Sequence, residues 1–152
     1  MVNVAKLILL VGKSEQDDQV KCMLSELGIA TPLKRPKKGD DEINFVLGDE
    51  SIELSFKVSE AIPSISENYS EGELILYAVF ARPASGKNES QMVLPHGLNM
   101  AVDRASVRAK LGKPEWSSPM MNNDRWVIDG LKTLVCFEEN EASIREIVFS
   151  IK

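Results

Sequence analysis

The residue types that can carry out catalysis or bind metal ions are few in this sequence, and the first to consider is its single histidine. His96 lies between Pro95 and Gly97. An imidazole titrates near neutral pH, so it can act as a general base or bind a metal ion. A metal site needs several more ligands, however, and no His, Cys or acidic residues occur at ligand spacing. We therefore predict no metal site and interpret His96 as a turn residue.

The other patterns that could carry chemistry are incomplete. The run Gly12-Lys13-Ser14 matches the end of a phosphate-binding loop, but the earlier glycine that such a loop requires is absent. The serines between Pro63 and Gly72 belong to no Gly-x-Ser-x-Gly motif and have no histidine nearby in the sequence. The sequence therefore predicts that the chain is not an enzyme and holds no cofactor.

The composition is that of an ordinary folded protein and not of a nucleic-acid-binding one. The 152 residues are 43% hydrophobic and 27% charged, which is enough to bury a core in one compact domain or two small ones packed together. The formal net charge is −5. Nucleic-acid binding requires an excess of Lys and Arg, so we predict no nucleic-acid partner. An acidic chain is compatible with a basic partner protein.

The apolar run from Leu7 to Val11 follows Lys6, as the apolar part of a signal peptide follows its basic start. This run is shorter than the roughly 7 to 15 apolar residues of a signal peptide. No other stretch approaches the roughly 20 apolar residues of a membrane span. We therefore predict a cytoplasmic protein without a membrane partner.

The two cysteines lack the paired spacing of a zinc or redox motif. Cys22 and Cys136 lie among apolar neighbours, in a predicted helix and a predicted strand. Free cysteine behaves as a small hydrophobic residue, so we expect buried free thiols. The sequence leaves a disulfide between them open.

Helices and strands follow one another in the same order twice along the chain. A helical run at 4–11 ends at Gly12, and Ser14 is expected to cap a second helix that ends at Gly28. In the second half, Asp103 is expected to cap a helix that Gly112 closes. Apolar and polar residues alternate in several segments, which predicts strands at 43–47, 52–58, 74–80, 126–128, 134–137 and 144–151.

The two halves also share the residues that mark these elements. The matched segments are Glu26-Leu27-Gly28 with Lys110-Leu111-Gly112, Gly48 with Gly130, Leu54-x-Phe56 with Val135-x-Phe137, and Ala78-Val79-Phe80 with Ile147-Val148-Phe149. We interpret this order as an internal duplication. The predicted fold is α+β, with one helix-and-sheet repeat at 1–83, a linker at 84–91 and a second repeat at 92–152. Each repeat is a helical hairpin on its own antiparallel sheet of three to four strands.

Motifs in the second half carry a resemblance to a known group. They are Leu94-Pro95-x-Gly97-Leu98, Asp103-Arg104-x-x-Val107-x-x-x-Leu111-Gly112-x-Pro114, Asp124-Arg125-Trp126, Val135-x-Phe137 and Ile144-x-x-Ile147. With these motifs the chain resembles little-characterised bacterial proteins laid out like the beta-lactamase inhibitor protein, in which tandem units each place a helical hairpin on an antiparallel sheet. Some immunity proteins of bacterial toxin systems share this plan. The resemblance implies a binding protein without catalytic residues.

The leading hypothesis is a non-enzymatic protein-binding module, an inhibitor or immunity-type partner of another bacterial protein. We expect the contact at an acidic, concave sheet surface. Trp126 is expected in the core, whereas Trp116 follows Pro114 in a predicted loop, where an aromatic side chain can anchor an interface. The candidate contact residues are Trp116, Asp124, Arg125, Asp49 and Glu53. The alternative is a homodimeric structural domain, paired through an exposed strand edge, or a small-ligand-binding domain.

Overall fold

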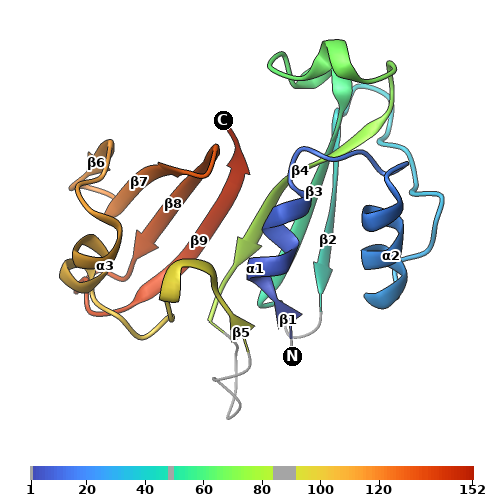
Figure 1. The fold of residues 1–152 in the computed structure, drawn as a ribbon. Coiled ribbons are helices and arrows are strands. Elements are labelled where there is room, and N and C mark those ends of the chain that lie inside the picture. Colours follow the sequence, from blue (N-terminus) through green and yellow to red (C-terminus); the bar gives the residue numbers. More distant parts are fainter. Residues whose placement is uncertain (1, 48–49, 84–91) are drawn as a thin grey trace.

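The strands of both halves pair into one seven-stranded antiparallel sheet (Figure 1). The computed structural model describes residues 2–47, 50–83 and 92–152. Across the sheet the order is β2 (Glu42–Leu47), β3 (Ile52–Val58), β4 (Leu74–Ala81), β9 (Ile144–Ile151), β8 (Leu131–Phe137), β7 (Asn123–Ile128) and β6 (Trp116–Ser118). The fold class α+β is confirmed, because helices accompany this large antiparallel sheet.

A short seam between β4 and β9 joins the two halves of the sheet. Four residue pairs form it, from Ala78 with Ser150 to Ala81 with Ile147. The prediction of a separate sheet for each half was therefore wrong. Each half alone would leave an edge of unpaired N–H and C=O groups, and the seam pairs these groups with one another.

Strand pairing on one side of the seam mirrors the pairing on the other. The series β2-β3-β4 corresponds to β7-β8-β9, and each series carries one register shift, at Ser55/Phe56 in β3 and at Cys136/Phe137 in β8. At the seam, the pair Phe80–Val148 lies between two pairs that are images of each other, Val79–Phe149 and Ala81–Ile147. The pairing therefore has a local two-fold symmetry centred on Phe80 and Val148.

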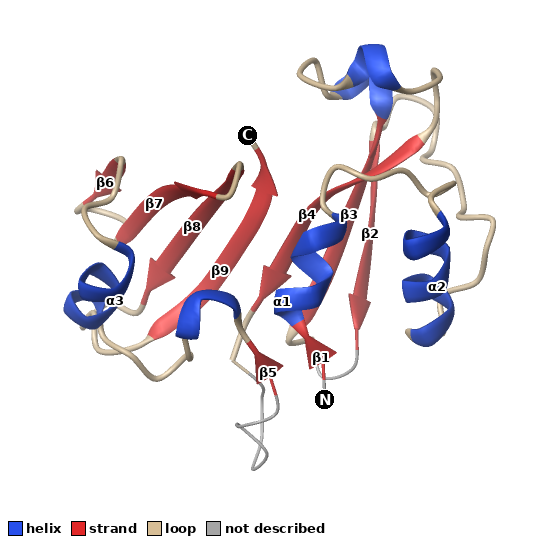
Figure 2. Cartoon of the chain, viewed as in Figure 1, coloured by secondary structure: helices blue, strands red, loops and turns tan. Residues whose placement is uncertain are grey.

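The helices lie against one face of this sheet (Figure 2). They are α1 (Val4–Leu7), continued by the 3-10 turn η1 (Ile8–Leu10), α2 (Asp18–Glu26) and α3 (Arg104–Leu111). In the second half, only the 3-10 turn η4 (Pro95–Gly97) precedes α3, so the expected second helical hairpin is reduced to a turn and one helix. Two further 3-10 turns, η2 (Ser59–Ala61) and η3 (Ser66–Asn68), lie between β3 and β4.

The helix caps are partly those that the sequence predicts. Asp103 caps α3, since its carboxylate accepts a hydrogen bond of 2.7 Å from the Ser106 amide. The cap of α2 is Asp17 and not Ser14, because Asp17 accepts from the Gln19 amide at 2.8 Å. The Ser14 hydroxyl accepts from the Gln16 amide at 3.0 Å and donates to the Glu73 carboxylate, which lies 59 residues away in the sequence.

The larger of two hydrophobic clusters fills the space between the helices and the sheet and extends through both halves. Strand residues that face the helices alternate with residues that face the other way. Trp126 belongs to this core, as predicted, and is 4% exposed. Cys136 is buried but Cys22 is exposed, and both are free thiols. Fully buried members of the core are Val4, Val20, Leu24, Ile52, Leu54, Phe56, Leu74, Leu76, Val79, Ala81, Val107, Val135, Ile147 and Phe149.

Residues 12–15 occupy the part of the β4 edge that lies beyond the seam. The Gly12 amide donates to the Leu76 carbonyl at 2.8 Å, and the Glu15 amide donates to the Leu74 carbonyl at 2.8 Å. The Glu15 carboxylate also accepts from the Leu74 amide and from two guanidinium nitrogens of Arg35. The two half-sheets therefore separate here, with residues 8–15 between them. A small parallel pair, β1 (Val2–Asn3) and β5 (Met92–Val93), was not predicted.

Candidate functional site

A row of seven side chains runs across all seven strands on the sheet face that points away from the helices. Each of these residues is paired with the next one on the neighbouring strand. Their neighbours along each strand point the other way, toward the helices and the core. We call this set the cross-strand row. Its members are Val46, Glu53, Phe80, Val148, Leu134, Arg125 and Trp116.

The middle of the cross-strand row is apolar and incompletely covered. Phe80, Val148 and Leu134 lie side by side on the three central strands, and each is half-buried. The two ends of the row carry the most exposed apolar groups, Val46 with 54% and Trp116 with 43% of their surface accessible. Apolar side chains of the row therefore reach solvent at both edges of the sheet and on its three central strands, with Glu53 and Arg125 between them.

Trp116 at the β6 end forms a small cluster with charged neighbours. The guanidinium carbon of Arg125 lies 5.3 Å from the centre of the Trp116 ring, a cation–π contact. The Nε of Arg125 donates to the Glu115 carboxylate at 2.9 Å. Arg125 thus joins the Trp116 ring to the Glu115 carboxylate at the sheet edge.

Glu53 belongs to a second charged cluster, next to Phe80. Arg82 donates to Glu53 at 3.2 Å and to Glu146 at 2.7 Å. The guanidinium carbon of Arg82 also lies 5.5 Å from the centre of the Phe80 ring. The acids near this part of the row are therefore paired with an arginine, so apolar surface and not negative charge characterises the row.

Asp124 does not lie on this face, contrary to the expectation that it contacts a partner. Its side chain is fully buried on the helix side of β7, where Arg104 and Arg108 of α3 donate to it. Burial by itself raises the pKa of Asp124, but hydrogen bonds from Arg108, Arg104 and Ser117 outweigh it and hold the pKa well below the ordinary value of 3.8. Asp124 joins α3 to the sheet and is closed to a partner.

The structure brings three of the five candidate residues into one row: Trp116, Arg125 and Glu53. Asp49 lies outside the described residues. The apolar members Val46, Phe80, Val148 and Leu134 were not predicted as contacts. Val46 is exposed and the other three are half-buried, and their alignment across the strands is visible only once the register is known. Alternation in the sequence marks residue 46 as facing away from the core, but the strand 74–81 is apolar throughout and gives no such signal for Phe80.

His96 lies in the turn η4, as expected, and its backbone is left-handed, with φ 61°. Among residues 2–47, 50–83 and 92–152, no group of three or more His, Cys, Asp or Glu residues could hold a metal ion. Within the same described ranges, no helix is long and apolar enough to cross a membrane.

Comparisons with known proteins identify no family for this chain. No protein-family model matches it, and no curated protein matches it. One solved structure that matches this chain is that of a cysteine-rich secretory protein from Staphylococcus aureus subsp. aureus Mu50, with 13% sequence identity and a TM-score of 0.48. The match covers 95% of this chain but only 44% of that protein. A likeness this distant indicates no function.

Proposed function

We propose that this protein is a non-enzymatic protein-binding module, of the inhibitor or immunity type, and that the cross-strand row is its contact surface. The observation that carries the proposal is the exposed Trp116 beside Arg125, at one end of a row whose three central members are apolar and half-buried. Trp and Arg are the residue types most enriched among energetically dominant interface residues. Half-buried apolar side chains beside them supply the surface that a partner would cover.

We also propose that the two halves are tandem copies of one unit, as in the beta-lactamase-inhibitor-protein-like layout. The mirrored strand order and the register shifts at Ser55/Phe56 and Cys136/Phe137 support this view. The symmetry places Phe80 and Val148 at equivalent positions in the middle of the row. A partner bound there would touch both copies at once.

The partner should present an apolar surface to the middle of the row. A basic partner remains part of the proposal, because the net charge of the chain is −5. However, the row itself contributes little free negative charge, since Arg82 pairs with Glu53 and Glu146. The negative net charge would then raise the association rate with a basic partner more than the affinity of the complex.

Affinity capture with matched baits tests this proposal. The bait proteins are the wild type, Trp116→Ala and Val46→Asp on the row, and Lys21→Ala on the exposed side of α2. The expected result is a bacterial protein that the wild type and Lys21→Ala retain equally and that both row variants lose. Truncation of an interface tryptophan typically costs about 2 kcal/mol or more, equivalent to at least about 30-fold in affinity.

Titration calorimetry with the purified partner then gives the affinity of each bait. Circular dichroism verifies that the variants are folded, which is expected because both substituted side chains are exposed. Equal affinity of the wild type and the two row variants would contradict the proposed surface. A partner that is an enzyme and loses activity on binding would support the inhibitor type.

A further inference from the structure

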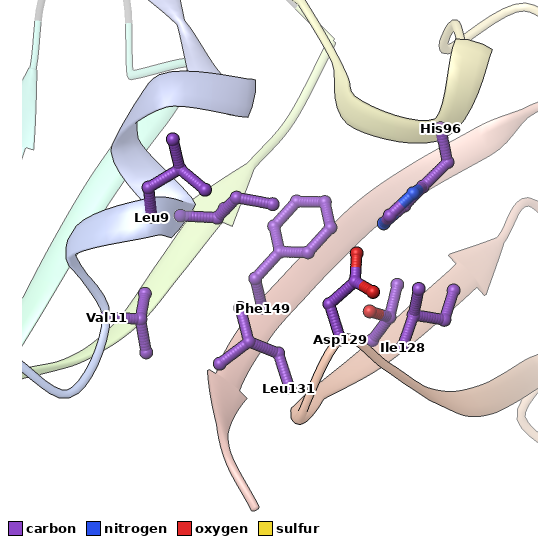
Figure 3. A pocket seen from close by; sticks show the side chains of 9 residues that line it. Leu9, Val11, His96, Ile128, Asp129, Leu131 and Phe149 are labelled. Atoms are coloured by element: carbon purple, nitrogen blue, oxygen red, sulfur yellow. The ribbon is translucent and has the colours of Figure 1, made fainter.

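A pocket opens on the helix side of the sheet, where the two half-sheets separate. Its volume is about 190 Å³. Residues of η1 and the following turn form one wall, and β8, β9 and the β7–β8 turn form the other (Figure 3). The apolar lining residues are Ile8, Leu9, Val11, Ile128, Leu131 and Phe149. This pocket lies on the opposite face from the cross-strand row and is independent of the function proposed for that row.

Two polar side chains stand at one end of this apolar pocket. The imidazole of His96 and the carboxylate of Asp129 point toward each other beside the Phe149 ring (Figure 3). They come from separate segments, the turn η4 and the turn between β7 and β8. Among the described residues, neither side chain has a hydrogen-bond or ion-pair partner. Asp129, which is exposed, therefore offers a carboxylate without an ion-pair partner among the described residues at the mouth of an apolar pocket.

The backbone at both polar residues fixes their direction. His96 has φ 61° and Asp129 has φ 51°, so both are left-handed, and each is followed by a left-handed glycine, Gly97 or Gly130. For Asp129 this is the two-residue turn that suits a β-hairpin. A histidine adopts this conformation less readily, and here the buried Pro95 before it and the bond from Lys110 to the Gly97 carbonyl hold the turn. The two groups are thus positioned before any ligand arrives.

Size and charge together define the ligand. A closed apolar cavity of about 150 Å³ accommodates benzene, so the volume here suits one six-membered ring with a short chain. An unpaired carboxylate favours a cation, and an uncharged imidazole nitrogen can accept a second hydrogen bond from the same group. We propose that this pocket binds a small primary arylalkylamine, with the ring against Phe149 and Leu131 and the ammonium group on Asp129 and His96.

Titration of the ¹⁵N-labelled protein with 2-phenylethylamine, followed by NMR, tests this assignment. We expect saturable shifts at the amides of residues 8–11, 96–97 and 128–133, with a dissociation constant on the order of 1 mM or tighter. The matched probes are 2-phenylethanol, which lacks the charge, 3-phenylpropionate, which reverses it, and ethylamine, which lacks the ring. Each should bind at least tenfold more weakly.

The matched variant is Asp129→Asn. An Asn-Gly pair adopts the same left-handed turn as Asp-Gly, so the variant should keep the hairpin and lose only the charge. We expect a loss of about two- to fivefold in affinity for 2-phenylethylamine, as for an exposed ion pair, with no loss in the control Glu67→Gln, an exposed acid remote in sequence from the pocket residues. Leu9→Ala, at a side chain that is 72% exposed, should weaken binding a few-fold through lost ring contact.

Three results would overturn the proposal. They are unchanged affinity in Asp129→Asn, binding of 3-phenylpropionate as strong as that of the amine, and shifts that stay linear up to about 10 mM amine without saturating. None of them bears on the cross-strand row, so the two proposals fail or stand separately.

Discussion

Asp124 and Phe45 occupy equivalent places in the strand pairing of the two halves, but their side chains make different kinds of contact. Through the strand pairing, Asp124 in β7 corresponds to Phe45 in β2, since the former pairs with Val135 and the latter with Leu54. Phe45 packs its ring edge against Phe56, with ring centres 6.0 Å apart. Asp124 instead receives charged hydrogen bonds from Arg104 and Arg108. The first half thus has an aromatic contact between two strands at this position, whereas the second half has an ion-pair network between the sheet and α3.

The substitution Asp124→Asn should destabilise the protein by about 3 kcal/mol, because removal of one partner leaves the nearly buried Arg104 without its main counter-charge. Urea denaturation at pH 7 measures this loss. The free energy of unfolding should be compared with that of Glu67→Gln, which we expect to match the wild type. A loss below about 0.5 kcal/mol would show that the network contributes little.

The lowered pKa of Asp124 also predicts how stability depends on pH. Its pKa is lower in the folded than in the unfolded chain, so its contribution is complete above the ordinary value of 3.8 and is lost as the pH falls below it. The wild type should therefore lose more unfolding free energy than Asp124→Asn between about pH 4 and pH 2. Urea denaturation across this range measures both slopes. Parallel slopes would contradict the assignment.

At the scale of the elements, the sequence offers two capping residues for α2 and does not decide between them. Ser14 and Asp17 are both good capping residues, and both accept a backbone hydrogen bond here, Ser14 from the Gln16 amide and Asp17 from the Gln19 amide. Only the second of these bonds caps α2, which begins at Asp18. The strand β6 was missed for another reason. Its three residues, Trp116–Ser118, are too few to show an alternation, and only pairing with β7 makes them a strand.

Asp17→Ala should lower the free energy of unfolding by about 1 kcal/mol, because the Gln19 amide loses its acceptor. Asp17→Asn should keep most of that stability, since the amide oxygen can still accept the bond. Thermal or urea denaturation followed by circular dichroism compares the two. If alanine and asparagine behave alike, the cap contributes nothing to α2.

For the whole molecule, the order of elements could be predicted from the sequence but their joining could not. Alternation and glycine positions located strands such as 74–80 and 144–151 closely, because those signals are local. The seam between β4 and β9 depends on residues nearly 70 positions apart, which no local pattern reveals. The sequence comparison, which set Ala78 against Ile147, differs from the strand pairing by one residue, because it too relied on local pattern alone. Symmetric pairing matches Val79 with Ile147, one residue further along.

Part of the candidate contact surface could likewise be predicted from the sequence, and part could not. Trp116 and Arg125 could be selected by residue type, since exposed Trp and Arg are typical of interfaces. Asp124 was selected together with Arg125, although neighbours on a strand face opposite ways and only one of them can lie on the open face. The row as a whole requires the register of every strand pair.

The shared core predicts that both halves unfold together. Leu54→Ala in the first half removes a fully buried side chain and should cost about 2–5 kcal/mol. Both tryptophans lie in the second half, so their fluorescence reports that half alone. We expect the fluorescence midpoint in urea to fall together with the midpoint from circular dichroism. A fluorescence midpoint that stays at the wild-type value would mean that the halves unfold independently.

The segment 12–15 along β4 has a consequence for solubility. It covers the stretch Leu74–Leu76, three consecutive apolar residues that are entirely buried. Such an edge, if uncovered, is a template on which a second molecule can add a strand and begin to aggregate. The buried Glu15, held by Arg35, puts a charge where an incoming strand would have to pair. These four residues therefore cover an edge on which strand addition by a second molecule could otherwise begin.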